Sequence, residues 1–132
     1  MSTCEDDDFR KKTNKLWRVI SMQLDPWGDL NFGGLCHLAA LSRRMSGEVF
    51  IRRLNRRLDS GLVAPIQVEL LEADMCPQEL NRRISPTRRI IQGVEFNGKV
   101  KVAYWFYKAH PDDGIESVGL HDCVRVPARD VI

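Results

Sequence analysis

At Gly47 the spacing of the apolar residues changes, and this change limits the folds that the chain can adopt. Before Gly47, apolar residues recur at steps of three and four, which is the period of an amphipathic helix. After Gly47, apolar and polar residues alternate, which is the period of a half-buried strand. Helices followed by antiparallel strands favour an α+β domain.

The first predicted helix spans residues 9–24. Asp6–Asp8 precede it, at the positive end of the helix dipole, where carboxylates are stabilising. Pro26 and Gly28 are expected to end the helix and turn the chain.

The second predicted helix spans residues 31–46 and is capped by Asn31 or Asp29. Gly47 fits the C′ position, where the backbone often adopts a positive φ. Because only a short turn separates the two helices, they are expected to form a helical hairpin over residues 8–46.

Five or six antiparallel strands are predicted in the β-sheet region, residues 47–132. They are expected at 49–54, 66–71, 90–96 and 99–107, with short strands near 124–126 and 131–132. Asn97-Gly98 is the pair most favoured in a type I′ hairpin, and 110–114 reads as a further turn. The expected fold is therefore an N-terminal helical hairpin followed by an antiparallel curled β-sheet or small open barrel.

The length of 132 residues fits one domain, 1–132, with one modest core. Its ends indicate a fragment of a longer protein, because the acids Glu5–Asp8 open the chain and the aliphatic pair Val131-Ile132 closes it. No apolar run approaches the ~20 residues that span a bilayer, so no membrane partner is expected.

The four cysteines, Cys4, Cys36, Cys76 and Cys123, are spread along the chain. The polar, acidic start does not resemble a signal peptide. Free thiols in a reducing compartment are therefore expected.

Enzyme classes find little support in the motifs. Cys36-His37, His110, His121 and Cys123 supply metal-ligand types, but no C-x-x-C pair gives the usual spacing of a zinc site. A G-x-S-x-G elbow and a P-loop are also missing from the sequence. The sequence predicts no enzyme, no cofactor and no metal, although a small hydrolase or metalloprotein remains a third hypothesis.

Arginine occurs in pairs that supply the candidate interaction residues. The pairs in question are Arg52-Arg53, Arg56-Arg57, Arg82-Arg83 and Arg88-Arg89. Guanidinium groups suit bidentate contacts to carboxylates or phosphates. Because 18 acids nearly balance 20 bases, subunit interfaces are favoured over a DNA-facing role. A stand-alone arginine-rich nucleic-acid-binding module is the alternative.

Four blocks of sequence, in order, resemble the lambda family of tailed-phage portal proteins. They read LDPWGDLNFGGLCHLAALSRRMSGEVFIRRL, PIQVELLEADMC, QGVEFNGKVKVAYWFYKAHPDD and RVPARDVI. Within them, the aspartate-glycine turn is Asp25 to Gly28, and the strand after it begins at Gly47-Glu48. The blocks cover about residues 16–132, which the resemblance places in the peripheral wing domain of a longer subunit.

This resemblance implies a structural subunit of a homo-oligomeric ring, usually of twelve copies, at one capsid vertex of the virion. DNA is packaged and ejected through such a ring, and the tail attaches to it. The implied partners are terminase, capsid or scaffold protein, a head–tail connector and double-stranded DNA. The protein would be made in the cytoplasm of the host bacterium.

Overall fold

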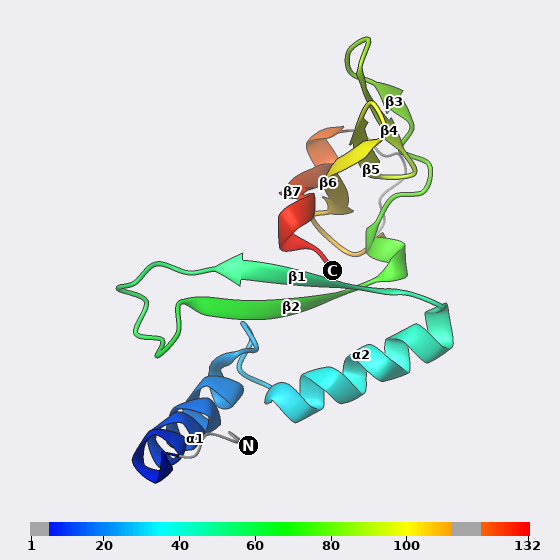
Figure 1. Cartoon of the computed structure of the whole chain (residues 1–132). Helices are drawn as coiled ribbons and strands as arrows, with labels where there is room; N and C mark the ends of the chain where they lie inside the picture. Colours follow the sequence, from blue (N-terminus) through cyan, green and yellow to red (C-terminus); the bar gives the residue numbers. More distant parts are fainter. Residues whose placement is uncertain (1–5, 112–119) are drawn as a thin grey trace. The chain divides into compact units, whose positions relative to one another are not determined.

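The computed structural model describes residues 6–111 and 120–132 (Figure 1). Two helices precede all the strands, and the described elements are α1 (Asp7–Gln23), α2 (Phe32–Ser46), β1 (Val49–Asn55), β2 (Ile66–Glu72), η1 (Ala73–Met75), β3 (Arg82–Arg83), β4 (Arg88–Ile91), β5 (Val94–Asn97), β6 (Val100–Tyr107), η3 (Leu120–Asp122), β7 (Cys123–Pro127) and η4 (Ala128–Asp130). The chain divides into two compact units. Unit 1 comprises Met1–Leu41 and Arg53–Leu70, and unit 2 comprises Ser42–Arg52 and Leu71–Ile132.

Both helices begin at side-chain caps, of which the sequence analysis suggested Asn31. The Asp6 carboxylate accepts hydrogen bonds from the backbone N–H groups of Asp8 and Phe9, at 2.9 and 3.0 Å. The Asn31 side chain accepts from the backbone N–H of Gly34 at 2.9 Å. Each cap thus satisfies N–H groups that have no partner within the first helical turn.

In unit 1, α1 contacts the start of α2 through two aromatic rings. The rings of Trp17 and Phe32 meet edge to face, with centroids 5.2 Å apart. The connection between the helices is fixed by Asp25, whose carboxylate accepts from the backbone N–H groups of Asp29 and Leu30, both at 2.9 Å. One aromatic contact and one buried carboxylate therefore act on the connection between the helices, while the helical hairpin expected over residues 8–46 stays a prediction.

Strand β2 joins unit 1 through Gln67, which is only 9% exposed. Its amide donates to the backbone carbonyls of Gln23 and Asp25, at 3.0 and 3.2 Å, and its carbonyl accepts from Arg56 at 2.7 Å. This polar side chain is therefore enclosed within unit 1. Its burial is tolerated because its polar atoms are hydrogen-bonded.

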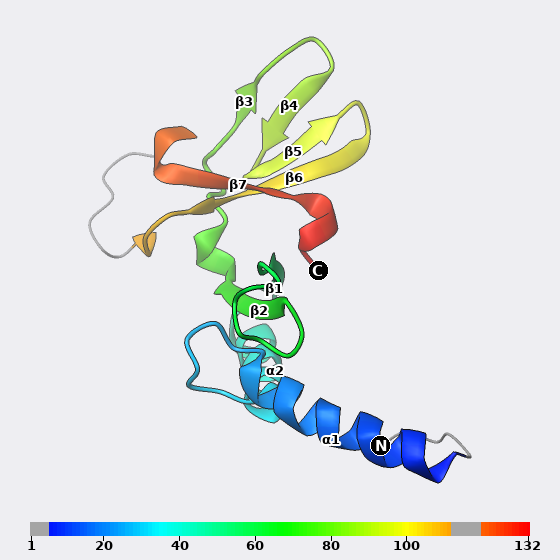
Figure 2. The same ribbon diagram turned by 90° about the vertical axis from the view of Figure 1, so that its left-hand side faces the viewer.

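Strands β1 and β2 form a two-stranded sheet, and β3 to β7 form a second sheet in the order β3-β4-β5-β6-β7 (Figure 2). All described pairings of the five-stranded sheet are antiparallel. Val131 adds an isolated antiparallel bridge to Arg52 on β1. The larger sheet is open, because β3 and β7 are its edges and do not pair with each other.

A tight turn divides the single strand expected over residues 90–96 into β4 and β5. Its two central residues, Gln92 and Gly93, have φ values of 49° and 76°. Positive φ at both central positions is the pattern of a type I′ turn. The sequence thus predicts this hairpin poorly, because Gln is not a usual first residue of such a turn.

The hairpin between β5 and β6 turns at Gly98 and Lys99, since Asn97 pairs directly with Val100. Gly98 has a φ of 61°, whereas Asn97 has no positive φ and lies in β5. The expected type I′ turn centred on Asn97-Gly98 is therefore wrong. Gly at the first central position is instead the signature of a type II′ turn.

The larger sheet packs apolar side chains against both faces. One core cluster contains Leu80, Ile90, Tyr107 and Cys123, and the other contains Cys76, Phe106 and Val126. Phe50 of β1 joins the second cluster, with its ring 5.3 Å from that of Phe106. Adjacent β6 residues supply opposite faces because successive side chains of a strand alternate.

The α+β class and the order of helices before strands are confirmed. The sheet does not close into a barrel, so the open-sheet form of the expectation holds. Most of the turn expected at 110–114 lies outside the described residues. The prediction of one domain, with a helical region up to residue 46 and a β-sheet region after it, stays a prediction. The two compact units divide the chain at other places, within α2, β1 and β2.

Candidate interaction surface

Glu95 lies at the centre of the strongest polar cluster in unit 2, and its side chain is fully buried. Strand β5 places it between Ile90 of β4 and Ala103 of β6. A carboxylate is seldom fully buried unless it is paired. Its partners therefore decide whether this position is stable.

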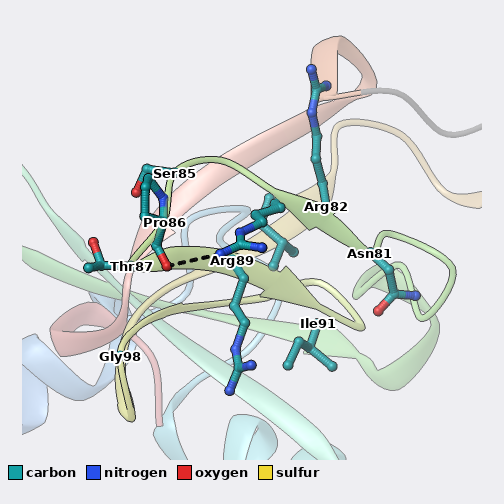
Figure 3. Close-up of a pocket in the computed structure, with 10 residues that line it drawn as sticks. Asn81, Arg82, Ser85, Pro86, Thr87, Arg89, Ile91 and Gly98 are labelled. Atoms are coloured by element: carbon teal, nitrogen blue, oxygen red, sulfur yellow. Dashed lines mark hydrogen bonds between the residues drawn. The ribbon is translucent and has the colours of Figure 1, made fainter.

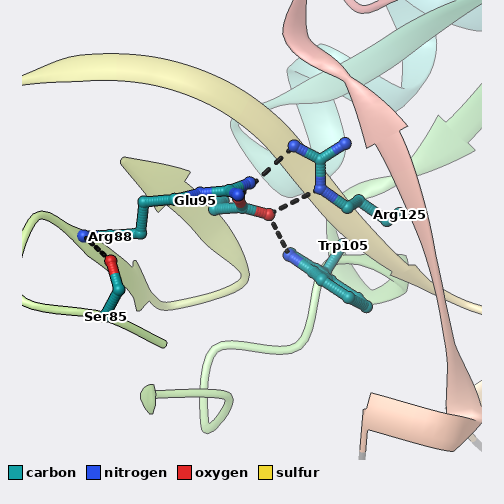
Figure 4. A network of polar contacts seen from close by, with 5 residues as sticks. All are labelled: Ser85, Arg88, Glu95, Trp105 and Arg125. Atoms are coloured by element: carbon teal, nitrogen blue, oxygen red, sulfur yellow. Dashed lines mark hydrogen bonds and ion pairs between the residues drawn. The ribbon is translucent and has the colours of Figure 1, made fainter. Parts of the chain in front are cut away.

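Two arginines and one indole hold the Glu95 carboxylate (Figure 4). Arg125 of β7 donates from Nε to Oε2 at 2.7 Å and from Nη2 to Oε1 at 3.3 Å. Trp105 of β6 donates from Nε1 to Oε2 at 3.1 Å, and Arg88 of β4 donates from Nη2 to Oε1. Four strands thus contribute to one network that ties the sheet together across its width.

Burial alone would raise the pKa of the Glu95 carboxyl. The hydrogen bonds from Arg125, Arg88 and Trp105 outweigh that effect, so the pKa lies below its ordinary value. Glu95 is therefore ionised at neutral pH. With two guanidinium groups on one carboxylate, the cluster carries an excess positive charge of one (two cations minus one anion).

A cavity of about 340 Å³ opens over this network. Its lining combines four arginines, one carboxylate and three apolar side chains: Arg82, Arg83, Arg88, Arg125, Glu95, Ile84, Trp105 and Leu120. Arg88 and Arg125 keep 43% and 38% of their side-chain surface exposed, whereas Glu95 keeps none. The cavity thus presents guanidinium groups to solvent and hides the carboxylate.

A second cavity, of about 750 Å³, follows the β3–β4 hairpin (Figure 3). Arg82 and Arg89 both line it, but their side chains point in different directions. Arg83 donates to the carbonyl oxygen of Pro86 at 3.5 Å. Arg83 also lies directly opposite Arg89 in the strand register, and like charges at such positions repel.

The predicted arginine pairs therefore divide between the two units. The β3–β4 hairpin of unit 2 brings together Arg82, Arg83, Arg88 and Arg89. Arg52 also belongs to unit 2, but it lies on β1. In unit 1, Arg56 donates to Gln67, and Arg57 makes a bidentate contact to Asp59 at 3.0 Å. Arg53 also lies in unit 1, on β1.

Sequence reasoning missed Glu95 and Arg125 as members of this surface. Glu95 is a polar residue in the middle of an apolar strand, which is a weak signal of a paired buried charge. Arg125 is a single arginine and belongs to none of the pairs. Its place beside Trp105 follows only from the register of β6 and β7.

The three cysteines that the structure describes are free thiols in different surroundings. Cys36 is exposed, while Cys76 and Cys123 are buried free thiols. Burial, with smaller effects of Glu48 and Cys123, raises the pKa of the Cys76 thiol to about 11. Within residues 6–111 and 120–132, no three His, Cys, Asp or Glu side chains form a group that could hold a metal ion.

The helices of the described ranges are too short or too polar to cross a bilayer. The described residues thus form an α+β protein with an open sheet and an arginine-lined surface. The family model "Phage portal protein, lambda family" matches residues 2–132, so the chain belongs to this family. Membership implies a portal-related structural role, with an oligomeric ring and association with the capsid vertex of the virion. A search of curated proteins finds no match to the chain.

Proposed function

We propose that this chain is a wing-domain part of a portal subunit whose role is assembly rather than catalysis. In the full-length protein, copies of the subunit form a ring through which DNA is packaged and later ejected. The family match over residues 2–132 carries this proposal. The proposed partners are other copies of the subunit, terminase, capsid or scaffold protein and a head–tail connector, in a virion assembled in the bacterial cytoplasm.

The arginine pairs are proposed as the charged part of the subunit contacts or as DNA-facing groups. A ring needs two different, complementary faces on each subunit. Charged groups at such faces fix orientation and reject wrong partners. The β3–β4 hairpin fits this requirement, because it concentrates four arginines on one element: Arg82, Arg83, Arg88 and Arg89.

Electron microscopy of the protein expressed from its complete gene tests this proposal. Negative-stain images, with the mass from light scattering, are expected to show rings of about a dozen subunits around a central hole, since identical heterologous contacts close on themselves. A monomer or dimer that binds duplex DNA with a steep salt dependence would contradict the portal proposal. That result would support the arginine-rich nucleic-acid-binding module instead.

A further inference from the structure

The cavity over Glu95 has more cationic groups than its own carboxylate can neutralise. Four arginines line it against one carboxylate, which leaves an excess charge of three (four minus one). Arg88 and Arg125 contact Glu95, yet each guanidinium has five N–H donors, and only one on Arg88 and two on Arg125 point to that carboxylate. Donors therefore remain for a second anion.

Two further arginines at the rim are not committed to an acid. Among the residues that the structure describes, the side chain of Arg82 has no hydrogen-bond or ion-pair partner, while its backbone pairs with β4. Arg83 contacts the carbonyl oxygen of Pro86, at a long 3.5 Å. Both residues form the short edge strand β3, and both line the cavity.

We propose that this cavity binds the carboxylate of an aspartate or glutamate from an acidic segment of a protein partner. The inference rests on the proposed assembly role, which makes the partner a protein. The occupant's carboxylate contacts Arg82 and the outward donors of Arg88 and Arg125. Its methylene groups lie against Ile84 and Leu120.

Three observations favour a carboxylate over the phosphate of a nucleic acid. The cavity already holds one carboxylate, Glu95, in a bidentate contact with Arg125. Its volume of about 340 Å³ and its apolar walls suit one side chain entering a recess, whereas duplex phosphates lie on a convex rod. The chain's formal charge is only +2, too small to attract a polyanion over long range.

Peptide binding by the full chain tests the proposal. Fluorescence anisotropy would measure the affinity for a fluorescein-labelled octaglutamate peptide and for a labelled 12-base-pair DNA duplex at about 0.15 M salt. Arg82→Ala removes a guanidinium group of the cavity that has no structural partner. Arg89→Ala removes the same charge from the neighbouring strand, outside this cavity, and is the matched control.

We expect Arg82→Ala to weaken peptide binding about tenfold, the effect of one charge-assisted contact. Arg89→Ala is expected to weaken it less than about twofold, because an exposed charge outside the cavity acts only through screened, long-range attraction. Equal losses in the two variants, tighter binding of the duplex than of the peptide, or no peptide binding at millimolar concentration would overturn the inference.

Failure of this inference and failure of the portal proposal give different results. Rings in the microscope together with equal effects of Arg82→Ala and Arg89→Ala would leave the portal role intact and remove the cavity as a carboxylate site. Selective peptide binding by a protein that forms no ring would keep the cavity and remove the portal role.

Discussion

Arg125 of β7 donates its Nε–H to Oε2 of Glu95 of β5 over 2.7 Å, although β6 lies between their two strands. The contact is made beside Trp105 of β6, whose indole N–H reaches the same carboxylate oxygen. Arg88 approaches from β4 on the other side. One buried carboxylate therefore links three neighbouring strands to its own, and its removal should loosen the sheet as a whole.

Glu95→Gln is expected to lower the free energy of unfolding by about 2–4 kcal/mol. The amide keeps the shape of the side chain but leaves Arg88 and Arg125 without their counter-charge, and breaking a buried pair typically costs about 3–5 kcal/mol. The expected loss is smaller than that for a fully buried pair because both arginines are partly exposed to solvent. Urea unfolding followed by circular dichroism measures the change.

Asp59→Asn is the control for this substitution. Asp59 pairs with Arg57 where both side chains are mostly exposed, at 67% and 88%. Such a pair contributes little, so the change should lie within about 0.5 kcal/mol. Equal effects of Glu95→Gln and Asp59→Asn would show that the buried network does not stabilise the sheet.

The stability of the protein should fall in acid because of Glu95. Its pKa in the folded protein is lowered, while in the unfolded chain it is about 4.3. The stabilisation is therefore fully present above about pH 4.3 and is lost as the pH falls through the folded-state pKa. Urea unfolding between pH 7 and pH 3 should show that the difference between wild type and Glu95→Gln shrinks below about pH 4. A difference that stays constant down to pH 3 would contradict this assignment.

Two glycines with positive φ should respond differently to alanine. Gly98 and Gly93 have φ values of 61° and 76°, and a side chain in that region costs about 1–2 kcal/mol. At Gly98 an added Cβ would meet nothing within 4 Å, but at Gly93 it would lie 2.7 Å from Sγ of Cys76 and 3.1 Å from the carbonyl oxygen of Pro77. We expect Gly98→Ala to cost about 1 kcal/mol and Gly93→Ala clearly more, from thermal unfolding. Similar losses would mean that the close packing at Gly93 is relieved by small shifts.

The described thiols should differ in their reaction with an aromatic disulfide reagent at pH 8. In a Cys4→Ser background, Cys36 is exposed and should react within seconds to minutes, while Cys76 and Cys123 should react only on unfolding. Burial excludes the reagent and raises the pKa of both thiols, so little thiolate forms. Fast reaction of more than one equivalent in the native protein would show that the sheet opens locally.

The helices and the α+β order were predictable because they depend on local signals. Asp6 and Asn31 cap the helices through side chains three or fewer residues away, and the apolar period identifies the rest. The turn at Gln92 was not predictable, because a positive φ at Gln is imposed by the pairing of β4 with β5 rather than by its own preference.

The candidate interaction surface was predictable only in part, since its geometry depends on strand register. The pair Arg82-Arg83 and the pair Arg88-Arg89 are visible in the sequence as charge clusters. Successive side chains on a strand alternate between its faces. Once β4 is known, this alternation explains why Arg88 contacts a buried carboxylate while Arg89 faces the other way. Arg125 lies about thirty residues away, and only the sheet order brings it to Glu95.

Gln67 is a polar residue that β2 buries, and its hydrogen bonds lead to a final prediction. Its side chain makes three hydrogen bonds, to Gln23, Asp25 and Arg56, while being 9% exposed. Gln67→Leu would keep the volume but leave two backbone carbonyls and one guanidinium N–H without this partner. Leaving buried polar groups without a hydrogen-bond partner costs about 1–3 kcal/mol. Urea unfolding should therefore show that the free energy of unfolding falls by at least about 1.5 kcal/mol. The same change at exposed Gln78 should alter stability by less than about 0.5 kcal/mol. If Gln67→Leu were neutral or stabilising, apolar burial rather than hydrogen bonding would hold β2 to its unit.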